Sequence, residues 1–212
     1  VPGTYFLRFG MANPQHLKIF LPELIDAYKD ERVFKFIHTP VQSGSNKVLR
    51  EMARGHSVED YRNIVSAFRK EFPEITIWTD IIVGFPNETE EDFLVSIKLL
   101  QETQPDLINI SSYSVRPGTK AAKMKQLTTE VKKERTRIIS QIAEEIYLQK
   151  NNNWLGWTGA VIVDEFNKKK QSFVARNYAY KPIVVRGNVE LGQIADVEIV
   201  DFTSTYLIGQ SK

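Results

Sequence analysis

Hydrophobic positions along the first 150 residues follow two alternating periods. Apolar residues three or four positions apart predict helices, and short runs of branched or aromatic residues predict strands. The predicted strands cover residues 5–9, 33–37, 75–83 and 106–113. The predicted helices cover residues 14–28 and begin after Ser45, Ser57, Thr89 and Thr128. This alternation predicts an α/β fold with a parallel sheet and right-handed crossovers.

Two of these helix starts carry a second signal. Ser57-Val58-Glu59-Asp60 and Thr89-Glu90-Glu91-Asp92 are capping-box patterns, in which side chains at both ends bond back to free backbone amides. The strand predicted over residues 75–83 shows little alternation, so we expect both of its faces to be covered.

The pattern changes near Asn151-Asn152-Asn153, where we expect a linker. Beyond it, glycine-punctuated strands are predicted over residues 159–164, 172–175, 182–186, 194–200 and 205–208. Five strands in about sixty residues predict a small closed β-barrel of OB type. The sequence therefore predicts two domains, residues 1–150 and 151–212.

Composition narrows the class of protein. The apolar fraction is 42% and the charged fraction 25%, which is typical of a soluble globular protein. The apolar runs are too short to cross a bilayer and no secretory signal opens the chain, so a cytoplasmic location is expected. The sequence contains no cysteine, which excludes disulfides, thiolate nucleophiles and thiolate-bound metals within these residues.

Three turns that follow predicted strands carry candidate chemistry. Gln42-Ser43-Gly44-Ser45 leads into a helix, where amides and the helix dipole favour an anion; an ordinary strand-to-helix turn is the alternative. Gly84 permits close backbone approach to a flat ligand, and Phe85 either stacks on that ligand or belongs to the core. Arg116 precedes Pro117-Gly118, a turn that aims its guanidinium at a carboxylate or leaves it on the surface. In barrels of alternating strands and helices such turns share one edge, so we expect one common site.

Neighbouring residues are further candidates. Asp80 lies in an otherwise apolar strand, and either a functional role or a structural hydrogen bond would explain a carboxylate there. For His38 a structural hydrogen bond is favoured, because no second histidine lies near it in the sequence. Arg8 and Asn13 flank another predicted strand end and could contribute to the same mouth.

Net charge is only +2, but its distribution is uneven. Residues 120–137 hold seven Lys/Arg against two Glu, a local +5, which is either a phosphate-binding patch or the solvated face of a helix. In the predicted barrel, aromatic and polar donors accompany a basic loop, as on surfaces that bind RNA by stacking and phosphate contact. The candidate RNA-binding residues are Lys168, Lys169, Lys170, Arg176, Asn177 and Tyr178.

The order and spacing of these motifs resemble the radical-SAM methylthiotransferases, in the archaeal and eukaryotic branch that modifies threonylcarbamoyladenosine in tRNA. The resemblance rests on residues 8–14, 38–54, 79–89 and 113–122, and the five-strand end is similar to the TRAM domain of that family. It implies the C-terminal part of a radical-SAM partial (βα) barrel followed by an OB-like TRAM barrel. Asn87 stands where that family usually has glycine.

The resemblance also implies chemistry. Such an enzyme uses S-adenosylmethionine (SAM), two 4Fe-4S clusters and an electron donor to add a methylthio group to carbon 2 of N6-threonylcarbamoyladenosine at position 37 of tRNA. Asp80 joins the residues that match its SAM-contacting turns, which are Gln42, Ser43, Gly44, Ser45, Ile82, Gly84, Phe85 and Arg116.

Because both clusters need cysteines, we expect this chain to be a C-terminal fragment that is inactive alone. The alternatives are a non-enzymatic RNA-binding scaffold, a methylthiotransferase of the isopentenyladenosine-tRNA or ribosomal-protein branch, and a barrel enzyme with another cofactor. The missing phosphate-type glycine loop disfavours the last of these.

Overall fold

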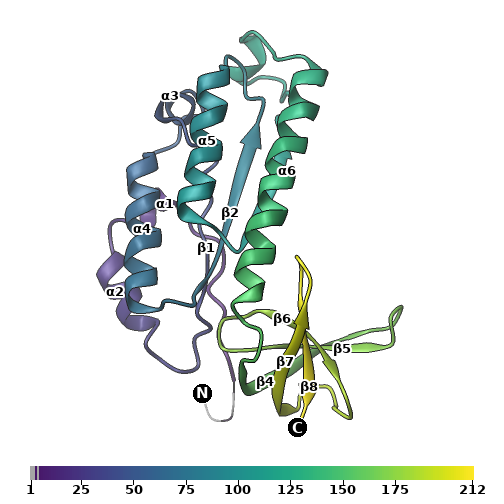
Figure 1. Ribbon diagram of the computed structural model, residues 1–212. Helices are drawn as coiled ribbons and strands as arrows, with labels where there is room; N and C mark the ends of the chain where they lie inside the picture. Colours follow the sequence, from purple (N-terminus) through teal and green to yellow (C-terminus); the bar gives the residue numbers. More distant parts are fainter. Residues whose placement is uncertain (1–2, 4) are drawn as a thin grey trace.

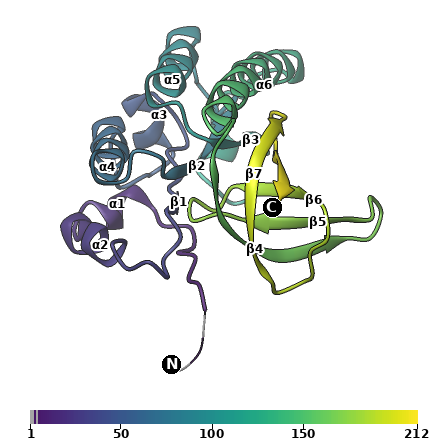
Figure 2. The same ribbon diagram turned by 60° about the horizontal axis from the view of Figure 1, so that its bottom comes forward.

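A three-stranded parallel sheet organises the first part of the chain (Figure 1). The structure is a computed structural model that describes residues 3 and 5–212. The sheet order is β1 (Phe36–His38), β2 (Thr76–Val83) and β3 (Leu107–Ser112). The helices form an arc around the outer side of this sheet (Figure 2). They are α1 (Pro14–Leu17), α2 (Leu21–Ala27), α3 (Asn46–Glu51), α4 (Val58–Glu71), α5 (Glu90–Thr103) and α6 (Thr129–Asn152).

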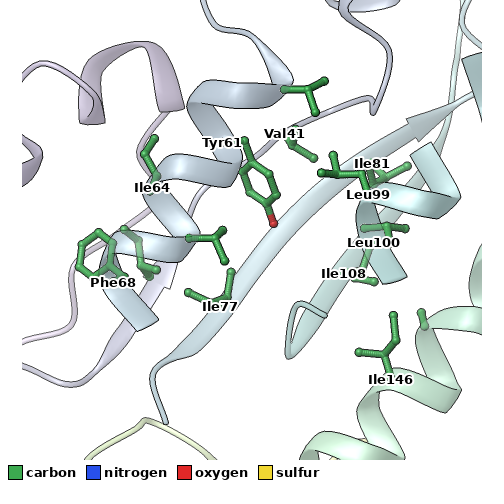
Figure 3. Packing of buried hydrophobic residues seen from close by; sticks show 14 of the residues in the cluster. Val41, Tyr61, Ile64, Phe68, Ile77, Ile81, Leu99, Leu100, Ile108 and Ile146 are labelled. Atoms are coloured by element: carbon green, nitrogen blue, oxygen red, sulfur yellow. The ribbon is translucent and has the colours of Figure 1, made fainter. Parts of the chain in front are cut away.

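The core lies between this arc of helices and the sheet (Figure 3). Tyr61 of α4 and Leu100 of α5 are fully buried, as are Ile77 and Ile81 of β2, which face them. Burying each such side chain contributes about 1.5–3 kcal/mol. Side chains on the inner face of β2 alternate with these and are only half-buried, so the prediction that both faces are covered is wrong. The half-covered inner face leaves room for a ligand.

The last part of the chain forms a closed five-stranded barrel, as predicted. The strand order around the barrel is β4-β5-β6-β8-β7, and a separate buried cluster that includes Val163, Ile183 and Val197 fills it. The strands are β4 (Thr158–Asn167), β5 (Ser172–Arg176), β6 (Pro182–Arg186), β7 (Ile194–Phe202) and β8 (Leu207–Ser211).

Three predicted elements near the start of the chain differ in the structure. Residues 5–9 form no strand, because Leu7 makes only an isolated bridge to Val33. That bridge also explains why β1 begins at Phe36 rather than at residue 33. The helix predicted over 14–28 is divided into α1 and α2, and Pro22, which favours the first turn of a helix, lies in the first turn of α2.

The linker predicted at the three asparagines is also wrong, because α6 continues through Asn152. Asn151 is buried, and its side-chain amide donates to the carbonyl oxygens of Thr203 (2.9 Å) and Ser204 (3.3 Å). These contacts lie beyond the reach of a local sequence pattern. They fix the end of α6 against the five-stranded barrel.

The barrel is attached at the amino-terminal ends of the sheet strands, at the bottom of Figure 1. The amide of Lys35 donates to the carbonyl of Tyr178 at 2.7 Å, and the ammonium of Lys181 lies 2.8 Å from Asp106. The carboxyl ends of β1, β2 and β3 are therefore at the opposite end of the molecule from the barrel. Within residues 3 and 5–212, no helix combines the length and apolar character that a bilayer crossing requires.

Candidate functional site

A cavity of about 790 Å³ lies at the carboxyl ends of the sheet strands. Gln42 from the turn after β1, Phe85 from the turn after β2 and Arg116 from the segment after β3 all line it. Asp80 and Ile82 on the inner face of β2 also line it. The structure thus brings together five of the nine predicted cofactor-contacting residues, one or more from each strand end.

Gln42 is placed by an extension of the sheet beyond β1. Its amide donates to the carbonyl of Asp80 (2.8 Å), and its own carbonyl accepts from the amide of Ile82 (2.9 Å). Its φ of 72° lies in the left-handed region, which costs a non-glycine residue on the order of 1 kcal/mol or more. Backbone of this kind persists where the surrounding bonds enforce it, and here it brings Gln42 into the cavity wall.

Asp80, which lines the cavity, is paired with His38 behind it in the sheet. Nε2 of His38 lies 3.0 Å from Oδ1 of Asp80, and the imidazole stacks on Trp78 with a centroid separation of 4.7 Å. The structural hydrogen bond expected for His38 is present. Asp80 still borders the cavity, where Asn109 of β3 is its register partner. This corner therefore offers a carboxylate and an amide side by side.

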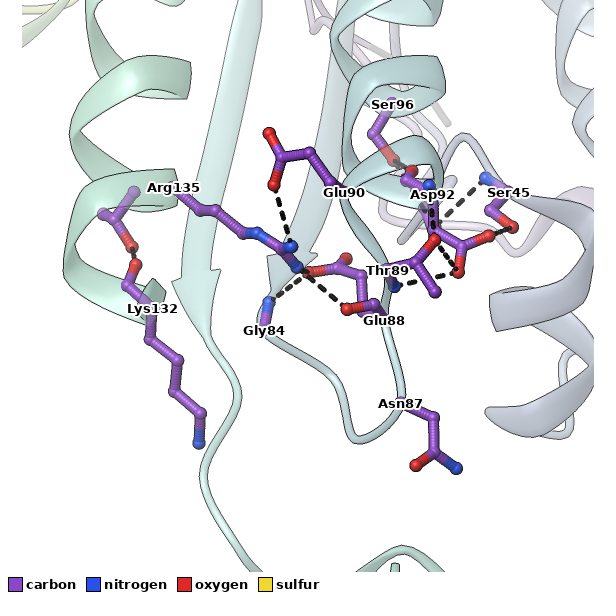
Figure 4. Close-up of polar contacts among 12 residues, drawn as sticks. Ser45, Gly84, Asn87, Glu88, Thr89, Glu90, Asp92, Ser96, Lys132 and Arg135 are labelled. Carbon is purple, nitrogen blue, oxygen red and sulfur yellow. Dashed lines mark hydrogen bonds and ion pairs between the residues drawn. The ribbon is translucent and has the colours of Figure 1, made fainter. Parts of the chain in front are cut away.

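Phe85 is held by the turn that follows β2. It is 5% exposed, and its ring meets the edge of Tyr113 at a centroid separation of 5.2 Å. The amide of Gly84 donates to Glu88 at 2.8 Å, and Glu88 in turn pairs with the buried Arg135 of α6 (Figure 4). Burial raises the pKa of Glu88, against the opposing effects of the Gly84 amide and the Arg135 guanidinium. These bonds fix the turn so that Phe85 faces the cavity.

Two backbone conformations in this turn explain its residue types. Gly84 has a φ of 72° and packs against the side chain of Lys132, so its amide and surface are already used within the chain. Asn87 has a φ of 61°, in the left-handed region that favours glycine and tolerates asparagine. Asparagine at position 87 can therefore adopt the same backbone turn that glycine adopts at this position in the family.

Ser43, Gly44 and Ser45 do not line the cavity. The amide of Gly44 donates to Ser96 of α5 (2.8 Å), and the amide of Ser45 donates to Ser43 (3.1 Å). Ser45 caps α3 and donates its hydroxyl to Asp92 at 2.6 Å (Figure 4). These groups are already bonded within the chain. Their role in this structure is to fasten the first turn to α5.

Arg116 lies in an exposed segment between β3 and α6. Its carbonyl accepts from the hydroxyl of Thr119 at 2.8 Å, which closes the predicted turn. Within the described residues, no carboxylate lies within ion-pair distance of its guanidinium. Arg116 is therefore available to a ligand carboxylate or phosphate at the cavity mouth.

Sequence reasoning also missed or misplaced cavity residues. Asn109 and Ser111 line the cavity from β3, and their alternation with Ile108 and Ile110 was a signal that could have indicated an inward polar face. Asn13 lines the mouth as suggested. Arg8 does not: its guanidinium stacks over the rings of Phe36 and Tyr180, toward the five-stranded barrel.

The predicted RNA-binding residues of the barrel differ in their exposure and in whether their charge is already paired. Lys168, Lys169 and Lys170 lie in the exposed turn between β4 and β5. Arg176 is half-buried and lies 3.2 Å from Asp164, so its charge is largely compensated.

Asn177 and Tyr178 differ in exposure, because Asn177 is buried and Tyr178 is 41% exposed. The side-chain oxygen of Asn177 accepts from the amides of Ala179 (3.1 Å) and Lys181 (3.0 Å). Tyr178 donates its hydroxyl to Glu74 of the α/β part. Tyr178 thus contacts the α/β part directly, and Asn177 shapes the turn that carries Tyr178 and Lys181.

The residues of this chain do not fit a thiolate-ligated iron–sulfur cluster, because the sequence contains no cysteine. In the part of the chain that the structure describes, no three His, Asp or Glu side chains form a group able to hold a metal ion. The cavity instead offers an amide, a carboxylate, an aromatic ring and a guanidinium. This set suits an organic ligand that carries both an aromatic base and charged groups.

Comparison with known proteins identifies both parts of the chain. Residues 9–100 match the Radical SAM superfamily, and residues 155–212 match the TRAM domain. The chain carries a radical SAM domain followed by a TRAM domain. The chain is similar in fold to coproporphyrinogen III oxidase (HemN) from Escherichia coli, with a TM-score of 0.52 at 14% identity, covering 90% of this chain and 45% of that one.

Full-length relatives extend across both domains. A protein of Archaeoglobus fulgidus is 44% identical over 210 residues, covering 99% of this chain and 49% of that protein; it is named probable threonylcarbamoyladenosine tRNA methylthiotransferase. The Homo sapiens threonylcarbamoyladenosine tRNA methylthiotransferase is 36% identical over 211 residues, covering 99% of this chain and 36% of that protein. The chain thus spans about half the length of the archaeal relative and about a third of the human one. The closed barrel β4–β8 is the TRAM domain. The cavity is lined by residues within the Radical SAM match and by residues of β3 and the segment after it, which follow that match.

Proposed function

We propose that this chain forms the SAM-binding and RNA-binding part of a tRNA methylthiotransferase that acts on threonylcarbamoyladenosine. One observation carries the proposal: residues from three strand ends of a radical SAM domain converge on one cavity, and that domain is joined to a TRAM domain. The names of the archaeal and human relatives support the choice of substrate.

Different cavity residues bind different parts of SAM. Phe85 and Ile82 offer apolar surface to an adenine ring, and the carboxylate of Asp80 and the amide of Gln42 suit its hydroxyl and amino groups. Arg116 grips a carboxylate with up to two charge-assisted hydrogen bonds. When bound beside a reduced iron–sulfur cluster, SAM supplies the radical that such enzymes use. The two clusters expected for the reaction have no cysteine ligands in this chain, whose own residues bind and orient SAM and RNA. An electron donor is expected as a separate partner.

Equilibrium dialysis of SAM against the 212-residue chain tests the cavity assignment. Arg116→Ala removes a charge-assisted contact worth about 1.5–3 kcal/mol and is expected to weaken SAM binding about 10- to 100-fold. Arg186→Ala is the matched control, because Arg186 is an exposed arginine of the TRAM domain. Failure of the wild-type chain to bind SAM, or equal affinities for the two variants, would contradict the assignment.

A second measurement tests the reaction. The complete gene product is expressed anaerobically in cells that lack this modification, and bulk tRNA is digested and analysed by mass spectrometry. The expected product is 2-methylthio-N6-threonylcarbamoyladenosine. If the product is instead a methylthiolated isopentenyladenosine, the protein belongs to the isopentenyladenosine-tRNA branch. If the tRNA carries no methylthio group, the RNA-binding scaffold is favoured.

A further inference from the structure

The positive charge of the molecule is concentrated beside the cavity. Residues 113–133, called the rim segment below, hold six Lys/Arg and one Glu, a local charge of +5. The whole chain carries only +2, which leaves −3 for all the other residues together. A polyanion that approaches this protein is therefore attracted to the end of the sheet where the cavity lies, at the top of Figure 1.

Three lysines of the rim segment are free to bind a ligand, whereas Lys132 is bonded to the carbonyl of Tyr113. Lys123, Lys125 and Lys133 are exposed, and within residues 3 and 5–212 none has a carboxylate within ion-pair distance. The neighbouring arginines of α6 differ: Arg135 is buried against Glu88, and Arg137 lies 2.6 Å from Glu134. The structure thus separates the basic stretch of the sequence into structural arginines and available lysines.

The rim segment is also held in place, by one contact that joins its two ends and by others near its middle. The amide of Asn87 donates to the carbonyl of Lys125 (3.3 Å), and the ammonium of Lys132 donates to the carbonyl of Tyr113 (3.1 Å). Between these points the side chain of Gln126 donates to the carbonyls of Ala121 and Met124. A charged segment fixed in this way loses little entropy when it binds a partner.

The TRAM domain offers less free positive charge. Residues 151–212 carry seven Lys/Arg and six Asp/Glu, and two of these cations, Arg176 and Lys181, are paired with carboxylates. Lys168, Lys169 and Lys170 are its exposed basic group. They lie at the opposite end of α6, a 24-residue helix that is about 36 Å long.

We propose that the rim segment is the main phosphate-binding surface of this protein, and that it binds the RNA backbone on either side of the nucleotide whose base enters the cavity. This inference rests on the proposed function and adds the surface that the RNA uses. A base can reach a cavity only when it is unstacked, as in a single-stranded loop, and the phosphates beside it must then lie at the cavity rim. Lysine–phosphate contacts there supply affinity without reading sequence.

The test compares two matched triple variants of the 212-residue chain. Lys123→Ala/Lys125→Ala/Lys133→Ala removes rim charge from residues that do not line the cavity, and Lys168→Ala/Lys169→Ala/Lys170→Ala removes the same charge from the TRAM turn. Binding of an unmodified tRNA transcript is measured by filter binding from 50 to 200 mM KCl. SAM binding by each variant is measured in parallel.

The rim variant is expected to bind tRNA at least tenfold more weakly at 100 mM KCl and to flatten the plot of log affinity against log salt by about 2, since each single-strand contact contributes about 0.7. Its SAM affinity is expected to stay unchanged, which shows that it folds. The TRAM variant is expected to lose less on both measures. An unchanged salt slope in the rim variant, or an equal or larger loss in the TRAM variant, would overturn the inference.

The same data separate this inference from the proposed function. If the wild-type chain binds tRNA but both triple variants bind as well as wild type, only the assignment of the surface fails. If the wild-type chain binds SAM but no tRNA, the RNA-binding part of the proposed function fails together with the inference.

Discussion

The two ends of the sheet differ in how their charged side chains are placed: a lysine–aspartate pair is buried at one end, and unpaired cations are exposed at the other. At the amino-terminal end, Asp106 and Lys181 are 5% and 4% exposed and lie 2.8 Å apart, between the radical SAM and TRAM domains. At the carboxyl end, Arg116, Lys123, Lys125 and Lys133 are exposed, and none of them has a carboxylate partner in the described residues. A buried charge must be paired to be tolerated, whereas an exposed unpaired charge costs little and can serve a ligand. Substitutions at one end should therefore change stability, and those at the other should change binding.

The largest expected effect is at the junction of the domains. Lys181→Met leaves the carboxylate of Asp106 buried without its ammonium partner and is expected to lower the free energy of unfolding by about 3–5 kcal/mol. Urea denaturation measures it. Lys169→Met, at an exposed lysine of the same domain, is the control and should change stability by no more than about 0.5 kcal/mol. If the two substitutions change the free energy of unfolding equally, the buried pair contributes no more to stability than an exposed, unpaired lysine, and the comparison fails.

A smaller effect is expected where the first turn meets α5. In Gly44→Ala the new Cβ would lie 2.4 Å from Cα of Ser96 and 2.5 Å from the carbonyl oxygen of Val95, so the helix or the turn must move. Overpacking of this kind costs about 1–3 kcal/mol. Because Gln42 lies in the same turn, SAM affinity should fall as well.

Gly10→Ala is the matched control, since nothing lies within 4 Å of its added Cβ. Unfolding curves and SAM titrations of both variants make the comparison. A Gly44→Ala protein as stable as the Gly10→Ala protein would mean that the first turn is not fastened to α5 in solution.

The smallest effect is a dependence on acid. Burial alone would raise the pKa of Asp92, but hydrogen bonds from Lys47, Ser45 and Thr89 outweigh it and lower this pKa to about 2, from 3.8 in the unfolded chain. The carboxylate therefore stabilises the fold above pH about 4, and this contribution, about 2 kcal/mol, is lost as the pH falls toward 2.

Asp92→Asn should lower stability at neutral pH and reduce the loss between pH 4 and 2, as followed by urea midpoints at each pH. Asp196→Asn, at an exposed aspartate of the TRAM domain, serves as the comparison and should keep the wild-type acid profile. If the profile of Asp92→Asn also matches that of wild type, the bonds that link α3 to α5 do not depend on this charge.

The sequence patterns correctly predicted those features that depend on interactions between residues close together in the chain. Both capping boxes form as expected, with Ser57 bonded to Asp60 and Thr89 to Asp92. The strand predicted over 182–186 has the bounds of β6, because hydrophobic alternation and flanking glycine define it without help from distant residues. The convergence of the three turns followed from a general property of parallel sheets.

Contacts between distant residues explain the failures. Gly44 reads as a ligand-binding glycine, yet its partner is Ser96, 52 positions away. Asn151 reads as a helix breaker, yet it is satisfied by carbonyls that come from the last ten residues of the chain. Asn177 was predictable in part, since an asparagine often accepts hydrogen bonds from amides that follow it in a turn. Burial removes Asn177 from the exposed face of the TRAM domain, whereas Tyr178 stays 41% exposed.

Asn151 and Lys181 have a consequence for anyone who would dissect this molecule. The side chain of Asn151 accepts from the ammonium of Lys181 at 3.1 Å, so the last turn of α6 supplies part of the solvation that this charge has lost. A TRAM module excised as residues 155–212 would carry a lysine without either of its acceptors, and a barrel grafted from another protein would leave Asp106 and Asn151 unmatched. The change of sequence pattern near Asn151 therefore marks a junction at which separating the two domains would expose or unpair buried polar groups.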